Sequence, residues 1–305
     1  MRLEDGRDSQ NVEDRRGQGG GFGGGFGGGR RGGGLAVGGI GGVVLVVLAL
    51  LFGVDPAMLT GGVQPGYAPP AIEGGGPPRT AQAPYATRPT GDDPGARFVS
   101  RVLAETEDVW NPIFESLGRR YEEPRLVLYS GVVQSGCGTA QAQVGPFYCP
   151  ADQRVYIDLD FLAQLQRQLG APGDFAAAYV IAHEVGHHVQ QQLGILGRVE
   201  QLKRRAGEAE ANALQVRVEL QADCLAGLWA RRAHEQRRIL EQGDIEEGLN
   251  AAAAVGDDRL QRRARGTVQP ESFTHGSSEQ RARWFRTGLE SGRLEACDTF
   301  APGRI

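Results

Sequence analysis

The chain has 305 residues, a net charge of -4 and a hydrophobic content of 40%, which suits one globular domain of ordinary size together with additional segments. The charge is too small, and basic residues are too little interleaved with aromatic ones, for a nucleic-acid-binding surface, so we expect no nucleic-acid partner. The 47 glycines and 16 prolines crowd the first third, which makes the globular part shorter than the chain.

Two segments at the start of the chain differ sharply in composition. Residues 1–34 begin with charged side chains and continue into a glycine tract with two phenylalanines. They offer too little apolar surface for a core, so we expect a disordered, glycine-rich tail. Residues 35–54 read LAVGGIGGVVLVVLALLFGV. A run of about 20 uncharged residues is long enough to cross a bilayer, so we expect one transmembrane helix here.

The charges on either side of this apolar run predict its orientation. Arg30 and Arg31 precede it and Asp55 follows it, which places the N-terminus in the cytoplasm and the rest of the chain outside. A cleaved signal peptide is the alternative, but 34 residues precede the run and no A-x-A site closes it. We therefore expect a single-pass protein of the inner (cytoplasmic) membrane that contacts the lipid bilayer through residues 35–54.

Residues 55–91 are rich in Pro, Gly, Ala and Thr and predict a flexible linker. The domain of residues 92–305 opens with apolar residues at helical spacing over 96–118. The segments RLVLYSGVVQ and RVYIDLDF predict strands, and the alternation in the second indicates a half-buried strand whose edge could receive an extended peptide. Helical patterns dominate after about residue 160. The expected fold is α+β, with a small sheet and a helical half.

Residues 183–187 read HEVGH. His183 and His187 are four positions apart, so on a helix both imidazoles lie on one face and can converge on one zinc ion. Glu184 can reach a zinc-bound water as a general base. The apolar run before the motif favours a buried helix over a solvated, histidine-rich one, and Gly186 indicates a close contact with a neighbouring element.

A catalytic zinc needs a third protein ligand and one open position. Glu219 and Asp223 are again four positions apart, on a helix predicted over residues 209–236. In one arrangement Glu219 binds the metal and Asp223 accepts a hydrogen bond from the far nitrogen of a ligand histidine. In the other arrangement the two carboxylates exchange these roles.

A further polar cluster lies in FTHGSSEQRARWF, residues 273–285. Ser277 can cap a helix that runs from Ser278 to about Leu289. His275, just before that helix, is well placed to donate a hydrogen bond to a tetrahedral oxyanion, with support from Arg281 or Arg283. The alternative role for His275 is a purely structural one at the start of the helix.

Five segments together carry a resemblance to a known family: EDGRDSQNVEDRRG, GCGTAQAQVGPFYCPADQRVYIDLDF, AHEVGHHVQ, ELQADCLAGLW and FTHGSSEQRARWF. Through them the chain resembles, nearly end to end, the bacterial neutral zinc metallopeptidases, which are membrane-anchored proteins of the gluzincin type. The resemblance implies one Zn²⁺ per chain, held by His183, His187 and Glu219, with Glu184 as the catalytic residue. It also implies that Asp223 supports a ligand histidine.

The segment THGSSEQR is similar to an element of related membrane-associated metallopeptidases, which implies parts in the site for Thr274, His275 and Arg281. The resulting prediction is a membrane-anchored zinc metalloendopeptidase that hydrolyses peptide bonds of a peptide or protein substrate. The competing class is a non-catalytic, metal-stabilised scaffold or binding protein tethered to the membrane. Cleavage of an unfolded protein that a chelator stops would separate the two.

Four cysteines occur in the chain, and a domain outside the cytoplasm can form disulfides. Cys137 and Cys149 enclose a short loop, and we predict that they form a disulfide that stabilises the domain by about 3 kcal/mol. Cys224 follows Asp223, and Cys297 lies near the C-terminus. A bridge between them would staple the tail over the active-site helices, a pairing that the sequence leaves open.

Overall fold

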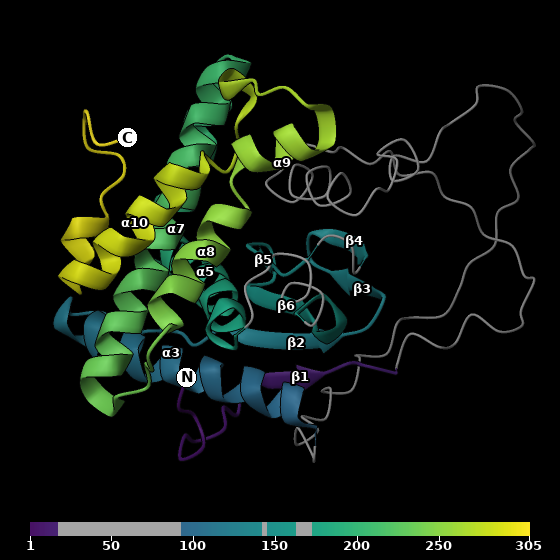
Figure 1. Cartoon of the computed structure of the whole chain (residues 1–305), viewed down its shortest axis with the longest axis vertical. Coiled ribbons are helices and arrows are strands. Elements are labelled where there is room, and N and C mark those ends of the chain that lie inside the picture. Colours follow the sequence, from purple (N-terminus) through teal and green to yellow (C-terminus); the bar gives the residue numbers. More distant parts are fainter. Residues whose placement is uncertain (18–92, 142–144, 163–172) are drawn as a thin grey trace, which may run out of the picture.

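The computed structural model describes four stretches of the chain: residues 1–17, 93–141, 145–162 and 173–305. The predicted transmembrane helix and linker, residues 35–54 and 55–91, lie outside these stretches. Among the helices that are described, none has the length and apolar character needed to span a membrane. The described part is a mixed α+β structure, as expected from the sequence (Figure 1).

The strands that lie next to the helical half form one small sheet (Figure 1). In spatial order its strands are β1 (Val12–Asp14), β2 (Arg125–Tyr129), β6 (Arg154–Asp158) and β5 (Phe147–Cys149). Strands β1, β2 and β6 run parallel, and β5 pairs antiparallel with β6. A separate hairpin consists of β3 (Val132–Ser135) and β4 (Gly138–Gln141).

Strand β6 forms where the sequence predicts it, but its surroundings differ from the expectation. It pairs with β2 on one side and β5 on the other, so β5 is the edge strand at this end of the sheet. Tyr156 and Asp158 belong to the face that was expected to be exposed, and both are buried. The ring of Phe147 stacks on Tyr156, and Asp158 accepts a hydrogen bond from the Gly131 N–H. Both faces of β6 are therefore covered.

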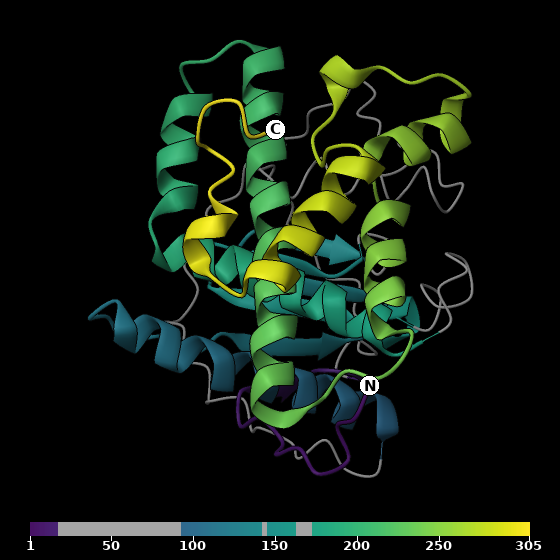
Figure 2. The ribbon, with the colours of Figure 1, turned by 60° about the vertical axis from the view of Figure 1, so that its left-hand side comes forward.

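The helical half consists of one helix between β1 and β2 and several helices after the last strand. Its members are α3 (Pro94–Ser116), α5 (Phe175–Gln192), α6 (Ile195–Lys203), α7 (Glu208–Arg237), α8 (Asp244–Ala254), α9 (Asp257–Arg265), α10 (Ser278–Ser291) and the 3-10 turns η2 (Pro270–Ser272) and η3 (Leu294–Cys297). Helices α7 and α10 pack against each other, and α5 packs against α7 and against strands of the sheet (Figures 1 and 2). The helices predicted over 96–118, 209–236 and 278–289 are all present, and Ser277 caps α10 as expected.

Glycines allow α7 to approach two other helices at backbone distance. A Cβ on Gly186 of α5 would lie 3.2 Å from the carbonyl oxygen of Ala222 on α7, which confirms the close contact expected at Gly186. A Cβ on Gly227 of α7 or on Gly288 of α10 would lie 2.0 or 1.9 Å from a backbone oxygen of the other helix. Real Cβ atoms essentially never approach an oxygen as closely as the last two distances, so Gly227 and Gly288 are what lets α7 and α10 touch through their backbones.

The first 17 residues are part of the folded domain. Met1, Leu3 and Val12 are buried, and β1 pairs with β2 along its whole length. The expectation of a disordered tail over residues 1–34 is therefore wrong for residues 1–17. The glycine tract dominates the average composition of that stretch, and it hides a short segment with enough apolar and polar groups to dock.

A buried carboxylate of α3 depends on this N-terminal segment. Glu107 is 1% exposed, and it accepts hydrogen bonds from Arg7 at 2.7 Å, from Ser9 and from Asn11 at 2.9 Å. A bilayer cannot separate these groups, nor can it separate β1 from β2. The single-pass arrangement, with the N-terminus in the cytoplasm and the domain outside, conflicts with these contacts.

The four cysteines form two disulfides. Cys137, in the turn between β3 and β4, is bonded to Cys149 of β5, which confirms the predicted pair and ties the hairpin to the edge strand. Cys224 of α7 is bonded to Cys297 of η3. The pairing that the sequence left open therefore forms as well, and it fastens the C-terminal tail to α7.

Candidate metal centre

Helices α5 and α7 bring three candidate ligands together. The Nε2 atoms of His183 and His187 lie 3.3 and 3.6 Å from Oε2 of Glu219, and all three side chains are buried. Their ligand atoms all lie within 4.8 Å of one another. Two ligands of a tetrahedral zinc with bonds of about 2.0–2.1 Å are roughly 3.3 Å apart. The three side chains therefore fit one zinc ion in both chemistry and spacing.

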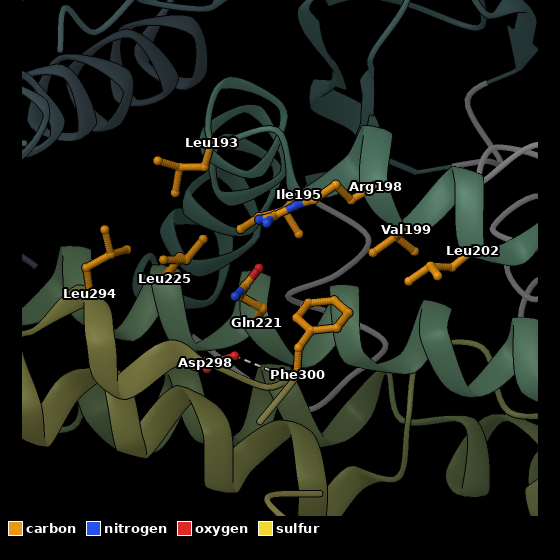
Figure 3. Close-up of a pocket in the computed structure, with 10 residues that line it drawn as sticks. All are labelled: Leu193, Ile195, Arg198, Val199, Leu202, Gln221, Leu225, Leu294, Asp298 and Phe300. Carbon is orange, nitrogen blue, oxygen red and sulfur yellow. Dashed lines mark hydrogen bonds between the residues drawn. The ribbon is translucent and has the colours of Figure 1, made fainter. Parts of the chain in front are cut away.

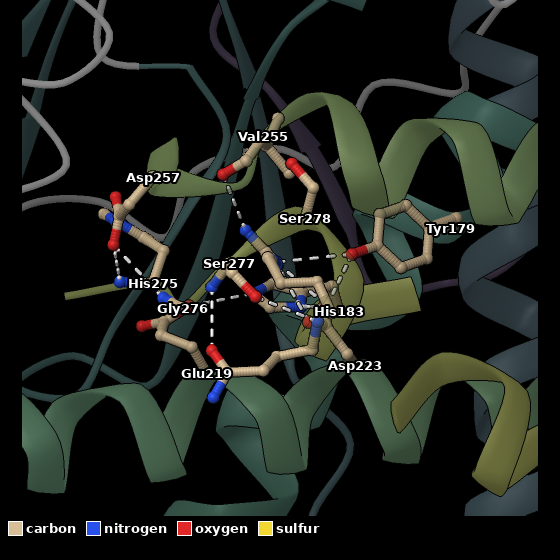
Figure 4. Close-up of polar contacts among 12 residues, drawn as sticks. Tyr179, His183, Glu219, Asp223, Val255, Asp257, His275, Gly276, Ser277 and Ser278 are labelled. Carbon is tan, nitrogen blue, oxygen red and sulfur yellow. Dashed lines mark hydrogen bonds and ion pairs between the residues drawn. The ribbon is translucent and has the colours of Figure 1, made fainter. Parts of the chain in front are cut away.

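Asp223 lies behind His183, on the side away from Glu219 (Figure 4). Its Oδ1 is 2.9 Å from Nδ1 of His183, and the hydroxyl of Tyr179 donates to the same oxygen. Of the two arrangements that the sequence left open, the geometry matches the one in which Glu219 lies near the Nε2 atoms of both histidines and Asp223 contacts Nδ1 of His183. The hydrogen bond from Nδ1 leaves Nε2 of His183 to face Glu219.

Arg281 of α10 contacts Asp223 and not the open side of the cluster. Its Nε lies 2.8 Å and its Nη2 2.9 Å from the two oxygens of Asp223. The guanidinium is 4% exposed and also donates to the carbonyl of Val255 and the hydroxyl of Tyr179. The structure therefore does not support the expected oxyanion role of Arg281, because its donors are directed at the support of His183.

Charges in this network shift the pKa values of its members in opposite directions. Burial lowers the pKa of His183, but the negative charge of Asp223 and the hydrogen bonds that the ring donates to Asp223 and Glu219 outweigh it and raise that pKa to about 9. Burial raises the pKa of Asp223, yet the charges of Arg281 and His183 bring it below its ordinary value. Burial also raises the pKa of Glu219, but the charge of His187 and hydrogen bonds from both histidines bring it well below its ordinary value, so this ligand carboxylate stays ionised as metal ligation requires.

Glu184 lies next to the cluster without belonging to it. Its carboxyl is buried, and burial raises its pKa, although the nearby charges of His187 and His183 act against that rise. The backbone of Tyr148, on the edge strand β5, also acts to lower the pKa of Glu184. A buried carboxyl with a raised pKa is suited to taking up a proton and releasing it again.

His275 is held by a carboxylate that the sequence reading did not single out. Oδ2 of Asp257 accepts the backbone N–H groups of Thr274, His275 and Gly276 at 2.7, 2.6 and 3.1 Å. Its Oδ1 lies 3.2 Å from Nδ1 of the His275 ring (Figure 4). Burial lowers the pKa of His275, but the bond to Asp257 and the charge of Glu219 raise it overall. With Nδ1 turned to Asp257, Nε2 is the ring atom left for other partners.

Comparison with known proteins agrees with this geometry. The model of the family described as "Putative neutral zinc metallopeptidase" matches residues 1–300. The chain belongs to this family. A relative from Escherichia coli (strain K12), "Uncharacterized protein YpfJ", is 48% identical over 300 residues, 98% of this chain and 99% of the relative.

"Uncharacterized protein Mb2605" of Mycobacterium bovis is 44% identical over 225 residues, which cover 70% of this chain and 74% of the relative. No solved structure matches the chain. The name of the neutral zinc metallopeptidase family indicates zinc as the metal and peptides as the substrates, and the His183, His187 and Glu219 cluster is a group in this chain that fits zinc.

Three residues of the candidate metal centre were not predicted from the sequence: Tyr179, Gln190 and Asp257. Tyr179 precedes His183 by one helical turn, and Gln190 follows His187 by three positions, so spacing on α5 could have pointed to both. Gln190 lies 2.9 Å from Nδ1 of His187. Asp257 stands 18 positions before His275, and no local pattern connects the two.

His188, the third histidine of the motif region, turns away from the cluster. Its Nδ1 is 3.1 Å from the Tyr148 hydroxyl, and its Nε2 is 2.6 Å from the carbonyl oxygen of Glu122. Burial lowers its pKa. It connects α5 to the edge strand β5 and is not among the candidate ligands.

Proposed function

We propose that this chain is a zinc-dependent endopeptidase. The observation that carries the proposal is the meeting of His183 Nε2, His187 Nε2 and Glu219 Oε2 at spacings that fit one zinc ion. Zinc bound by these residues would lower the pKa of a water ligand to about 7 and polarise a peptide carbonyl. The family name supports the same metal and the same class of substrate.

The protein groups around the cluster can carry the proton and the developing charge. Glu184 takes a proton from the attacking water and then delivers it to the leaving amine, a double duty that its raised pKa favours. Nε2 of His275 donates a hydrogen bond to the carbonyl oxygen as negative charge builds up there. Asp257 fixes the ring for this task, since it binds Nδ1 and the backbone on both sides.

The edge strand β5 is the element best suited to hold an extended peptide. Among the described strands it has a neighbour on one side only, and the backbone of its central residue Tyr148 lies close enough to Glu184 to affect the pKa of that carboxyl. Addition of a substrate strand to a free sheet edge is a common mode of peptide recognition. We therefore assign to β5 the substrate-binding edge that the sequence suggested for β6.

The two disulfides support a location of the domain in an oxidising compartment outside the cytoplasm. The contacts of residues 1–17 with α3 and β2 support a location of the N-terminal segment in the same compartment. If residues 35–54 contact the bilayer, as their composition suggests, both flanks of that segment then lie on the same side of it.

Labelling of intact cells tests this topology. A cysteine is introduced at Gln10 in one variant and at Glu290 in another, both exposed positions, and a membrane-impermeant maleimide is added. We expect the two sites to react alike. Reaction at one site and protection of the other would show that a bilayer separates the two parts, and would contradict the shared compartment.

Hydrolysis of unfolded casein by the purified full chain tests the enzymatic proposal. We expect cleavage that a chelator stops and zinc restores. Glu184→Gln should keep zinc and lose cleavage, because the amide cannot accept the proton of the water. Full activity in that variant would remove Glu184 from the mechanism. A wild-type chain that binds zinc without cleaving any peptide would instead match the scaffold alternative.

A further inference from the structure

The two histidines of the cluster are held through Nδ1 by partners of different chemistry. His183 faces the carboxylate of Asp223, while His187 faces the side-chain amide of Gln190, with Nδ1 and Oε1 2.9 Å apart. Gln190 is completely buried on α5. A carboxylate accepts hydrogen bonds at either oxygen, but an amide has a donor end and an acceptor end, so its orientation matters.

The surroundings of Gln190 fix that orientation. Its Nε2 donates to the carbonyl oxygen of Val218 at 2.8 Å and to Oε1 of Gln221 at 3.0 Å. Both amide hydrogens are thus used, and only Oε1 is left to face His187. An amide oxygen accepts and cannot donate, so Nδ1 of His187 carries the proton. Nε2 then keeps its lone pair for the cluster.

Gln221 on α7 extends the same chain of bonds. Since its Oε1 accepts from Gln190, its Nε2 donates, and it does so to the carbonyl oxygen of Cys297 at 3.0 Å. Gln221 also borders a pocket lined mainly by apolar side chains, such as Leu225 and Phe300 (Figure 3). The Cys297 carbonyl is therefore the polar group that holds this amide, and the disulfide to Cys224 keeps it in place.

We propose that Gln190 is a positioning residue that sets the tautomer of His187. Gln221 and the Cys224–Cys297 disulfide hold the amide of Gln190 in the orientation that this requires. Every bond in the chain points the same way: from the Nδ1–H of His187 through both amides to the carbonyl of the C-terminal tail. Reversal of either amide places donor against donor or acceptor against acceptor, so the chain has one favoured direction.

The inference rests on the proposed function only where it concerns metal affinity. Partners of ligand histidines typically change metal affinity by about 10–100-fold when they are removed. The tautomer of His187 is a property of the metal-free protein and can be observed without any metal. Two separate measurements on the full chain therefore distinguish failure of this inference from failure of the zinc assignment.

The first measurement is the long-range ¹H–¹⁵N NMR spectrum of the metal-free wild-type protein, which shows which ring nitrogen of a histidine carries the proton. It is recorded at about pH 8, where an ordinary imidazole is neutral and can adopt either tautomer. We expect His187 as the Nδ1–H form. In Gln190→Leu the acceptor is gone, and we expect the Nε2–H form to appear. Wild-type His187 in the Nε2–H form would overturn the proposal, and this arm needs no variant to fold.

The second measurement is the dissociation constant for zinc, determined by competition with a chelator. We expect Gln190→Leu to weaken binding by about 10–100-fold. Gln221→Leu and the double variant Cys224→Ser with Cys297→Ser should weaken it in the same direction by less, since each leaves the bond to His187 possible. Gln191→Leu makes the same change at the next, half-buried position of α5 and should bind zinc like the wild type.

Wild-type zinc affinity in Gln190→Leu together with an unchanged tautomer would contradict the role of Gln190. Wild-type zinc affinity in both the Gln221 variant and the cysteine variant would show that Gln221 and the disulfide-linked C-terminal tail do not position Gln190. A wild-type protein that binds no zinc would refute the proposed function, while the tautomer measurement would still decide the present inference.

Discussion

Arg281 donates two hydrogen bonds to the carboxylate of Asp223, from Nε at 2.8 Å and from Nη2 at 2.9 Å, and both side chains are buried. The pair stands directly behind His183, because Oδ1 of Asp223 also lies 2.9 Å from Nδ1 of that ring. The charge of Arg281 holds the pKa of Asp223 below its ordinary value against the effect of burial. The support of one candidate ligand therefore depends on a residue of α10, far along the chain.

Replacement of this arginine should be costly. Arg281→Met leaves the Asp223 charge buried without its main partner, so we expect the free energy of unfolding to fall by about 3–5 kcal/mol. Urea denaturation of the metal-free protein measures it. Arg283→Met, the same change at an exposed position of α10, should stay within about 0.5 kcal/mol of the wild type. Equal stability of the two variants would mean that the buried pair contributes nothing.

His275 should act on the reaction without holding the metal. We expect His275→Ala to keep one zinc per chain and to lower kcat by about 10²–10³-fold, the usual effect of removing one oxyanion donor, with a smaller change in KM. Steady-state kinetics on a fluorogenic peptide, alongside metal analysis, provide the check. Loss of zinc in this variant would instead make His275 a ligand, and an unchanged kcat would leave it a structural role at the start of α10.

The docking of the N-terminal segment predicts a stability effect at Val12. This side chain is 4% exposed in β1, so Val12→Asp places a carboxylate in the core. We expect a loss of about 3 kcal/mol or more in the free energy of unfolding of the full chain. Gln10→Asp introduces the same group at an exposed position two residues earlier and should change stability little. Indistinguishable unfolding curves would show that residues 1–17 do not pack on the domain.

Zinc affinity should rise with pH across the neutral range. The pKa of His183 in the metal-free protein is raised to about 9, so a proton must leave the ring when a metal binds to it. From this residue we expect a tightening of about tenfold per pH unit between roughly pH 7 and pH 9. Competition titrations at several pH values test it. Constant affinity over that interval would mean that His183 is already neutral or is not a ligand.

The raised pKa of His183 makes the stability of the metal-free protein change with pH in the opposite direction to its zinc affinity. A histidine whose folded pKa exceeds the unfolded value of about 6.5 stabilises the fold fully below that pH. This contribution is lost as the pH rises through about 9. Apo stability and zinc affinity should therefore change in opposite directions over this range.

Local patterns in the sequence predicted much of the site and little of its support. His183 and His187 share a helix face through their spacing, and Glu219 and Asp223 do so on a second helix, so the pattern predicted both pairs. The oxyanion role expected for Arg281 followed from its position near His275 in the chain and from the family resemblance. Its actual partner, Asp223, lies on another helix and becomes its neighbour only where Gly227 and Gly288 let α7 and α10 touch.

Two further differences from the expected fold have a similar origin. The alternation in RVYIDLDF indicates a half-buried strand, but it cannot show that Phe147 and the Gly131 loop cover the second face. The disorder expected for the N-terminus reflects an average over 34 residues, whereas Val12 docks by pairing with a strand more than 100 positions away. Such non-local contacts leave no period in the sequence.

Zinc content of the purified wild-type chain and of Glu219→Gln tests the central claim most directly. The substitution keeps the size of the side chain and removes the negative charge that faces both imidazoles. The account predicts one zinc per wild-type chain and a large loss of zinc, with loss of peptide cleavage, in the variant. A wild-type protein that binds no zinc, or a variant that keeps a full equivalent of it, would contradict a metal site built from His183, His187 and Glu219.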